Sequence, residues 1–245
     1  MNAQARVGAP AVGEVLRQTP HLQLKDIVYE NVKQDIVELV FSPGTHLRER
    51  DLAEKFKVSK TPVREALSRL AQDQLVEVHA YRGAMVTGYS RVDLMEIYQL
   101  REILQGACAR EATLTIGADD LAELGRVVLA SRQAMEADHI AELPHLFESF
   151  DQIIYRQTSN GRILDLVWTL DAHLRRIGNL TVRIPGRLAK SVVQHEEIFE
   201  AIGRRNPTGA ESMMREHIAS VLADQLAAYE EDVMVMSPET IGEMQ

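Results

Sequence analysis

The chain is short of cysteine, of aromatic residues and of long apolar runs. Only one of its 245 residues is a cysteine, Cys108, so no intrachain disulfide can form, as is usual in a reducing cytoplasm. No run approaches the roughly eighteen apolar residues of a membrane span, and the first twenty residues show no signal-peptide core. We therefore expect a cytoplasmic protein with no membrane partner. Aromatic residues make up only 5%, and Leu, Ala and Glu are common, which favours helices.

A general excess of positive charge is also missing. The formal net charge is −9, which by itself speaks against a nucleic-acid partner. The charge is unevenly divided, however. Residues 21–88 hold ten Lys/Arg and ten Asp/Glu, whereas residues 89–245 hold fifteen and twenty-five. Within Lys55–Leu70 five cations stand against one acid, which is a local basic patch of the kind that attracts phosphate groups.

Two short helices joined by a tight turn are predicted between Gly44 and Arg69. The turn falls at Val58-Ser59, and Pro62 lies in the first turn of the second helix, where a missing N–H costs nothing. The inward positions of the second helix are Val63, Ala66, Leu67 and Leu70. Its outer face is left with Lys60, Thr61, Arg64, Ser68 and Arg69. A helix-turn-helix needs this division, because one side packs and the other reads a major groove.

A β-wing is predicted after these helices. Residues 75–78 and 84–87 have the pattern of two short strands, and the turn between them carries Arg82 and Gly83. A cation there can reach a phosphate or a minor groove. An amphipathic helix over residues 24–40 precedes the pair and ends before Ser42. Together these elements predict a winged helix from about Leu22 to Thr87.

Two motifs follow one another in this region: L-x-E-x-x-L-A-x-x-x-x-V-S-x-T-P-V-R-E-A-L-x-R-L, which starts at Leu47, and R-G-A-x-V, which starts at Arg82. Together they resemble the DNA-binding domain of the GntR family of bacterial transcription regulators. Lys60 departs from the pattern, since the family usually has arginine there. Lysine keeps the charge but loses the bidentate fork, so a base contact can become a phosphate contact. The DNA-contact candidates that the resemblance and the residue types indicate are Arg50, Lys60, Thr61, Pro62, Arg64, Arg69, Arg82 and Gly83.

The remainder of the chain is predicted to be helical throughout. Ser90 and Asp93 form a capping box, and Asn160-Gly161 closes the third of about six helices. The predicted helices span 91–115, 119–137, 139–158, 162–183, 188–203 and 207–229. We expect a mainly α protein: a flexible arm (1–20), a winged helix-turn-helix with a small β-wing (21–88), a C-terminal antiparallel all-α bundle (91–230) and a flexible tail (231–245).

Four ionisable residues fall in phase with the apolar stripes of this bundle, each on a different helix: Arg101, Asp151, His195 and His217. Burying them is costly unless they pair, bind a metal or meet a charged ligand. Two imidazoles and one carboxylate suit a divalent ion such as zinc, nickel or manganese. Arg101 could instead form a salt bridge with Asp151. We assign Arg175 and Arg176 to a solvated face and expect His145 and His173 to be partly exposed and idle.

The bundle resembles the FCD domain, the ligand-binding domain of the FadR branch of the same family. The similar segments are L-R-x-x-L-Q from Leu100, F-D-Q-I-I-Y-R-Q-T-S-N from Phe150, H-x-x-I-x-x-A-I from His195 and M-R-x-H-I from Met214. Many members bind a metal through one aspartate and three histidines. Here the usual aspartate falls on Phe147 and the first histidine on Asp151, while His195 and His217 remain. Two alternatives stay open: a metal site of Asp151, His195 and His217, or a metal-free site that holds its effector through Arg101, His195 and His217.

The resemblance implies a transcription regulator, a repressor that binds double-stranded operator DNA as a homodimer and responds to a small organic-acid effector. The effector candidates are Arg101, Asp151, His195 and His217. The competing readings are a metal-responsive regulator and a helical metalloenzyme with a two-histidine, one-carboxylate site. No general base or second motif accompanies such a site in the sequence, so we do not expect an enzyme.

Overall fold

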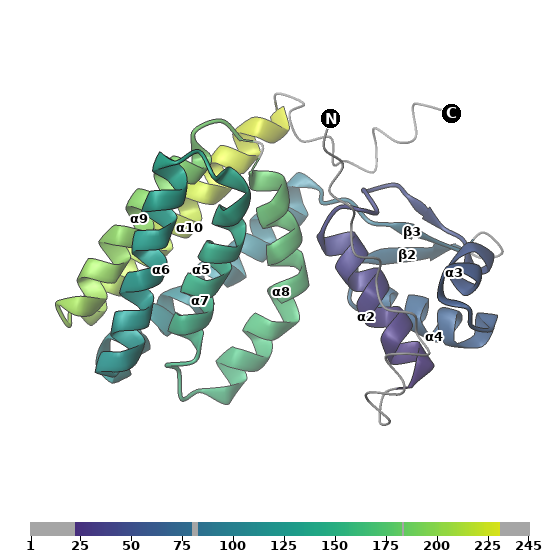
Figure 1. Ribbon diagram of the computed structural model, residues 1–245, viewed down its shortest axis with the longest axis horizontal. Helices are drawn as coiled ribbons and strands as arrows, with labels where there is room; N and C mark the ends of the chain where they lie inside the picture. Colours follow the sequence, from purple (N-terminus) through teal and green to yellow (C-terminus); the bar gives the residue numbers. More distant parts are fainter. Residues whose placement is uncertain (1–22, 80–82, 183, 231–245) are drawn as a thin grey trace. The chain divides into compact units, whose positions relative to one another are not determined.

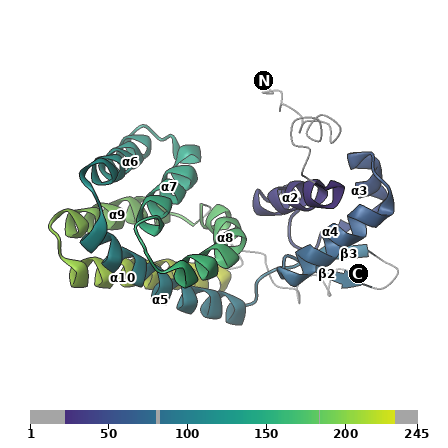
Figure 2. The ribbon, with the colours of Figure 1, turned by 90° about the horizontal axis from the view of Figure 1, so that it is seen from below.

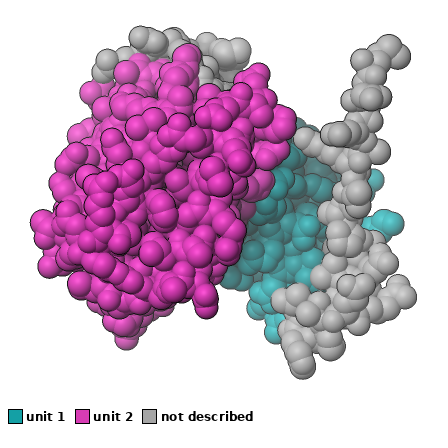
Figure 3. Space-filling view, turned by 60° about the vertical axis from the view of Figure 1, so that its left-hand side comes forward, with its two compact units in different colours: residues 1–88 teal, residues 89–245 magenta. Residues whose placement is uncertain are grey.

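The computed structural model describes residues 23–79, 83–182 and 184–230, and helices account for most of them (Figure 1). The chain divides into two compact units, the first ending at Gly88 and the second beginning at Tyr89 (Figure 3). The arm 1–20, the tail 231–245 and Arg82 lie outside the described residues. Among the described helices, none is long and apolar enough to cross a membrane.

Three helices form the body of the first unit: α2 (Leu24–Val37), α3 (Glu49–Phe56) and α4 (Lys60–Gln72). Both α2 and α3 pack against α4, and Val32, Ile36 and Leu70 are fully buried between them. Helix α2 ends three residues before the predicted Val40. Leu39 takes a left-handed conformation (φ 59°), which breaks the helical path.

The turn between α3 and α4 has the predicted place. Lys57 closes α3 in a left-handed conformation (φ 55°), and Ser59 is the residue before α4. The four predicted inward residues of α4 are buried, as expected: Val63, Ala66, Leu67 and Leu70. Lys60 and Arg64 are exposed on the other side, and Arg69 is exposed beside α2. The division into a packing face and an outer face is therefore confirmed.

The sheet has the antiparallel order β1-β3-β2, with strands β1 (His46–Leu47), β2 (Val76–His79) and β3 (Gly83–Val86). Strand β1 was not predicted, because two residues carry no periodicity. Gly83 has φ 89°, and a Cβ added to it would lie 2.5 Å from the carbonyl oxygen of Leu47. The wing therefore needs glycine at this position, both for its backbone conformation and for the close approach of β1.

Six α-helices and one short 3-10 helix form the described part of the second unit, in agreement with the predicted all-α bundle (Figures 1 and 2). They are α5 (Arg91–Thr115), α6 (Ala118–Glu136), η1 (Ile140–Glu142), α7 (Leu143–Tyr155), α8 (Gly161–Thr181), α9 (Arg187–Gly203) and α10 (Pro207–Glu230). Helix α5 packs along α10, α10 along α9, and α9 against α6; α8 contacts α5 and α7. Leu94, Phe150 and Ile198 lie fully buried among them.

The helix ends agree with the sequence in one place and differ in another. The predicted capping box opens α5: Asp93 N–H donates to Ser90 Oγ at 3.1 Å, and Ser90 N–H donates to Asp93 Oδ2 at 2.7 Å. Asn160, in contrast, does not close the third helix, because α7 already ends at Tyr155. It caps α8 instead, accepting from the Arg162 N–H at 3.1 Å.

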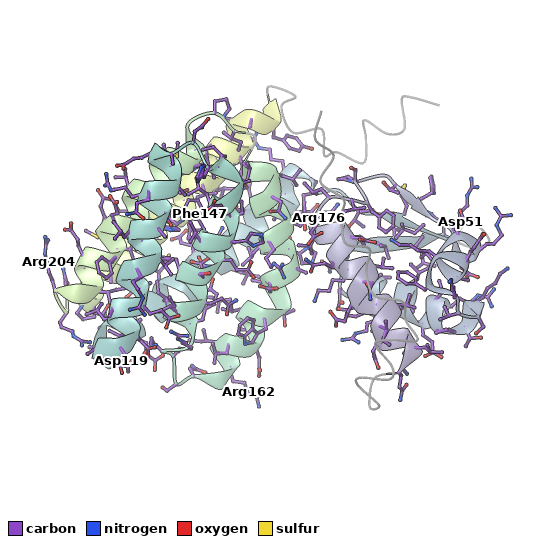
Figure 4. The ribbon with its side chains drawn as sticks, viewed as in Figure 1. Asp51, Asp119, Phe147, Arg162, Arg176 and Arg204 are labelled. Carbon is purple, nitrogen blue, oxygen red and sulfur yellow. The ribbon has the colours of Figure 1, made fainter. Side chains whose placement is uncertain are left out.

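The assignment of Arg176 to a solvated face was wrong. Its side chain is fully buried on α8 (Figure 4), and its guanidinium lies 5.1 Å from the ring centre of Tyr89. Its neighbour Arg175 is partly exposed and forms an ion pair with Glu148. Adjacent residues on a helix point about 100° apart, so one arginine can be buried while the other is solvated.

Candidate functional sites

A groove runs between α4 and the wing strands in the first unit, with a volume of about 1370 Å³. Its cationic residues come from two elements: Arg48 and Arg50 at the start of α3, and Lys60 and Arg64 in the first turns of α4. The other lining residues are His46, Glu49, Leu67, Ser68, Ala71, Gln72, Val78, His79 and Gly83. The groove thus presents four permanent cations against a single carboxylate, which favours an anionic ligand.

Arg64 is held in place by Glu49. The Nε–H of Arg64 donates to both carboxylate oxygens, at 2.9 and 2.8 Å. This hydrogen bond, together with the negative charge of Glu49, raises the pKa of Arg64 above its usual value. The bonds use one of the five N–H donors of the guanidinium, so Glu49 orients the side chain while terminal donors remain available for another acceptor.

Some of the predicted DNA-contact residues lie in this groove and some do not. Arg50, Lys60, Arg64 and Gly83 line it, whereas Thr61 and Pro62 do not. Arg69 faces α2, where its guanidinium lies 3.7 Å from the ring centre of Tyr29 and 3.3 Å from Asp26. These contacts give Arg69 a role in packing the unit.

Three groove residues were missed by the sequence reasoning: His46, Arg48 and His79. His46 lies on the short β1 strand and His79 at the end of β2, so the sheet is needed to bring them to α4. Arg48 is the residue before α3 and two positions from Arg50. Its closeness in sequence to Arg50 was the one signal that could have identified it.

In the second unit, Arg101 and Asp151 form a pair across α5 and α7. Their closest atoms, Nη2 and Oδ2, are 3.5 Å apart. Gln105 bridges the same two groups, because its Oε1 accepts from Arg101 Nε at 3.0 Å and its Nε2 lies 3.4 Å from Asp151 Oδ2. Gln105 also hydrogen-bonds Tyr155. The structure therefore contains the salt bridge that the sequence offered as an alternative to ligand binding.

Burial outweighs this pairing in setting the charge of Asp151. Removal from water raises the pKa of its carboxyl to about 6, although Arg101 and the hydrogen bond from Gln105 act in the opposite direction. The pair is thus desolvated and held at a distance longer than a good charge-assisted hydrogen bond. A ligand carboxylate that reached Arg101 could take the place of Asp151.

His195 lies among aromatic rings. It stacks on Phe150 with 4.2 Å between ring centres, and the ring centre of Phe147 (labelled in Figure 4) lies 4.8 Å away, with the two rings at 72°. Its Nδ1 is buried, and no described residue forms a hydrogen bond with it. Burial, with the nearby charges of Arg101 and Arg187, lowers the pKa of His195 to about 3, so the ring is neutral at physiological pH.

The ring of His217 lies 4.8 Å from that of His195 and is held in one tautomer. Gln194 Oε1 accepts from Arg187 Nη2 at 2.5 Å and lies 2.9 Å from His217 Nδ1. An amide oxygen only accepts, so His217 Nδ1 must carry the proton and its Nε2 keeps a lone pair. Burial and the neighbouring His195 hold the pKa of His217 well below its usual value, so this ring is neutral too.

Arg187 organises this side of the cluster and was missed by the sequence reasoning. Its fully buried guanidinium donates to Ser220 at 2.9 Å and to Asp224 at 2.6 Å, besides Gln194. A cation directly after Pro185-Gly186 looks like an ordinary exposed residue at a helix start. No local pattern in the sequence distinguishes it from one.

The predicted metal ligands do not form a metal site. Over the described ranges, no group of three or more His, Cys, Asp and Glu side chains is placed to hold an ion. Asp151 is paired with Arg101, and Phe147 places an aromatic ring beside His195 where the family usually supplies a carboxylate. An aromatic ring cannot replace a carboxylate ligand, and the remaining carboxylate, Asp151, is engaged by a cation. The residues present therefore fit an anion better than a metal ion.

A winged helix with a cation-lined groove, followed by a separate all-α unit with a buried polar interior, is typical of a DNA-binding protein with a second helical domain. Comparison with known proteins agrees. Residues 24–86 match the bacterial regulatory proteins of the gntR family, and residues 96–220 match the FCD domain. The chain belongs to the GntR family of transcription regulators and has an FCD domain.

Two relatives extend the match over most of the chain. The HTH-type transcriptional repressor RspR of Escherichia coli (strain K12) is 27% identical over 197 residues, which cover 79% of this chain and 85% of RspR. An HTH-type transcriptional regulator in an unstable DNA locus of Streptomyces ambofaciens is 32% identical over 204 residues, covering 80% and 83%. Since the family and these relatives are transcription regulators, this chain is a regulator and the metalloenzyme alternative is dropped.

The fold has a counterpart among solved structures. E. coli McbR/YncC superposes with a TM-score of 0.68 at 22% identity, covering 87% of this chain and 100% of McbR/YncC. At this identity the likeness concerns the fold. GntR regulators bind operator DNA, and the cation-lined groove described above is consistent with this. They also typically form dimers.

Proposed function

We propose that this regulator is a homodimeric repressor whose affinity for its operator is controlled by a small organic acid bound inside the FCD domain. The winged-helix unit, residues 21–88, would read the DNA, and the helical unit, residues 91–230, would bind the effector and join the two copies. The observation that carries the effector proposal is the Arg101–Asp151 pair, placed between α5 and α7 near two neutral imidazoles.

For DNA binding, α4 lies in a major groove, with Lys60 and Arg64 directed at it and Arg48 and Arg50 at the flanking phosphates. Support comes from the groove that gathers these four cations and from Glu49, which fixes the direction of Arg64. An arginine held in this way can form two parallel hydrogen bonds to a guanine edge. Thr61, Gly83 and Arg82 remain proposed contacts at the edge of this surface, whereas Pro62 and Arg69 are proposed to shape α4.

The effector carboxylate binds Arg101 and displaces Asp151. Two features support this arrangement: the long separation of the pair, 3.5 Å, and the buried Nδ1 of His195, which has no hydrogen-bond partner in the part of the chain that the structure describes. A buried polar atom of this kind is costly unless a ligand or water satisfies it. Effector binding then changes operator affinity through a coupling of about 1–3 kcal/mol. No metal ion is required.

The DNA-binding proposal is tested with a duplex selected from random DNA by the full-length protein. Arg64→Ala should weaken binding to this duplex at least about tenfold, since one good bidentate contact contributes about 1–3 kcal/mol. Arg204→Ala is the matched control, because Arg204 is an exposed arginine in the other unit, paired with Glu200. Equal affinities of the two variants in a gel-shift titration would contradict the proposed docking.

The effector proposal is tested by thermal shift with acetate, lactate, succinate, malate and citrate, with chloride at matched ionic strength as the control. At least one carboxylate should raise the melting temperature, and Arg101→Gln should remove that rise. If none of the acids stabilises the wild-type protein beyond chloride, the proposal fails. The addition of Zn²⁺, Ni²⁺ or Mn²⁺ alone decides the alternative, because strong stabilisation by an ion would favour a metal-responsive regulator.

A further inference from the structure

Tyr89 is the first residue of the second unit and directly precedes Ser90, which caps α5. It directly follows Thr87 and Gly88, the linker between β3 and the second unit, yet its side chain is buried. Its hydroxyl hydrogen-bonds His173 Nδ1 at 2.8 Å, and the two rings meet edge to face with 5.7 Å between centres. The guanidinium of the buried Arg176 lies 5.1 Å from the ring centre of Tyr89. Two residues of α8 thus hold the residue at which the linker enters the bundle.

A second connection joins α5 to α8 deeper in the bundle. Gln225 on α10 is fully buried, and its Nε2 donates to Tyr98 Oη at 2.7 Å and to Thr181 Oγ1 at 2.5 Å. Tyr98 belongs to α5, and Thr181 is the last residue of α8. The ring centre of Tyr98 also lies 5.5 Å from the guanidinium of Arg101. This connection therefore borders the proposed effector site.

The two connections lie at different heights along the same pair of helices. Tyr89 lies just before the start of α5 and Tyr98 lies within it, whereas His173 and Thr181 are eight residues apart on α8, or about 12 Å at the rise of an α-helix. A shift of α5 against α8 beside Arg101 is therefore transferred to Tyr89 by two stiff helices. Since packed helices move between discrete arrangements, even a small shift can change the position of the linker end.

We propose that Tyr89, His173 and Arg176 form a clamp that transmits the state of the Arg101 site to the linker before Tyr89 and so sets operator affinity. This inference rests on the proposed effector function and names how that site regulates DNA binding. It assigns a signalling role to His173, which the sequence reasoning had considered idle. The clamp lies entirely within the second unit, so it acts on the linker whatever the placement of the DNA-binding unit.

The clamp is tested by Tyr89→Phe, which removes the hydroxyl and keeps the ring, in the full-length protein without effector. Affinity for the selected duplex should change at least about fivefold, the lower end of measured couplings between sites. Backbone amides of residues 88–93 should exchange hydrogen faster. Tyr229→Phe, near the end of α10, is the matched control and should alter neither quantity. A change in affinity below about fivefold for Tyr89→Phe, or unaltered exchange at residues 88–93, overturns the clamp.

A second variant distinguishes loss of the clamp from misfolding of the protein. His173→Leu removes the same hydrogen bond from the α8 side, so its effect on duplex affinity should not add to that of Tyr89→Phe in the double variant. Additive effects would overturn the inference. Failure of the effector proposal is distinguishable, because it appears as absent stabilisation of the wild type by the carboxylates, a measurement in which the clamp variants take no part.

Discussion

Arg187 offers the sharpest test of how the second unit is held together. Its side chain is fully buried, and its guanidinium donates to Gln194, Ser220 and Asp224 at 2.5, 2.9 and 2.6 Å. In Arg187→Met the apolar volume is largely kept, while every one of these hydrogen bonds is lost. Asp224 remains partly exposed and keeps Lys190 as a partner at 3.2 Å, so it does not become a buried unpaired charge.

The expected loss follows from these contacts. Removing one partner of a buried ion pair costs about 3–5 kcal/mol when the other charge is left buried. Because Asp224 is still paired and solvated, we expect the lower end, about 3 kcal/mol of unfolding free energy. For a unit of this size each kcal/mol lowers the melting temperature by about 2–4 °C, so Arg187→Met should lower it by about 6–12 °C.

The assay is thermal unfolding followed by circular dichroism, with Arg132→Met as the matched control. Arg132 pairs with Glu196 in the same unit but is half exposed, and exposed ion pairs contribute little. The control should melt within about 2 °C of the wild type. If Arg187→Met is no less stable than the control, the buried network does not stabilise the unit and the reasoning is refuted.

Three further outcomes are expected. Gly83→Val should lower the unfolding free energy of the first unit, measured by urea denaturation, by about 1–3 kcal/mol, since φ is 89° and a Cβ would lie 2.5 Å from a carbonyl oxygen; an unchanged urea midpoint would show that the wing tolerates a side chain. Burial raises the pKa of Cys108 to about 12, so iodoacetamide at pH 8 should label the folded protein at least about a hundredfold more slowly than the urea-unfolded protein, and equal rates would contradict this. The neutral chelator 1,10-phenanthroline should leave carboxylate-induced stabilisation intact. Loss of that stabilisation would instead favour a metal-responsive regulator.

The winged helix was predictable because its signals are local. The inward positions of α4 recur within thirteen residues, and the outer cations stand between them in the same segment. The prediction of the groove was less complete, because His46 and His79 reach the groove only through strand pairing with β3. A two-residue strand such as β1 leaves no periodic trace in a sequence.

The interior of the bundle was predictable as a set of positions but not as a network. Helical phase placed Arg101 and Asp151 inward, and the structure pairs them. Helical phase could not show that Arg176 and Arg187 are buried, since burial of a charged residue depends on which helix covers it. Nor could it show that Phe147 lies against His195, a contact between α7 and α9 that turns a candidate metal site into an aromatic enclosure.

The most direct measurement is the structure of the full-length protein bound to its selected duplex. The account predicts α4 in a major groove, with terminal nitrogens of Arg64 within hydrogen-bonding distance of a base edge while Glu49 still holds its Nε–H, and Lys60 against a base or phosphate. A complex in which Lys60 and Arg64 face solvent, and another surface of the protein contacts the DNA, would contradict it.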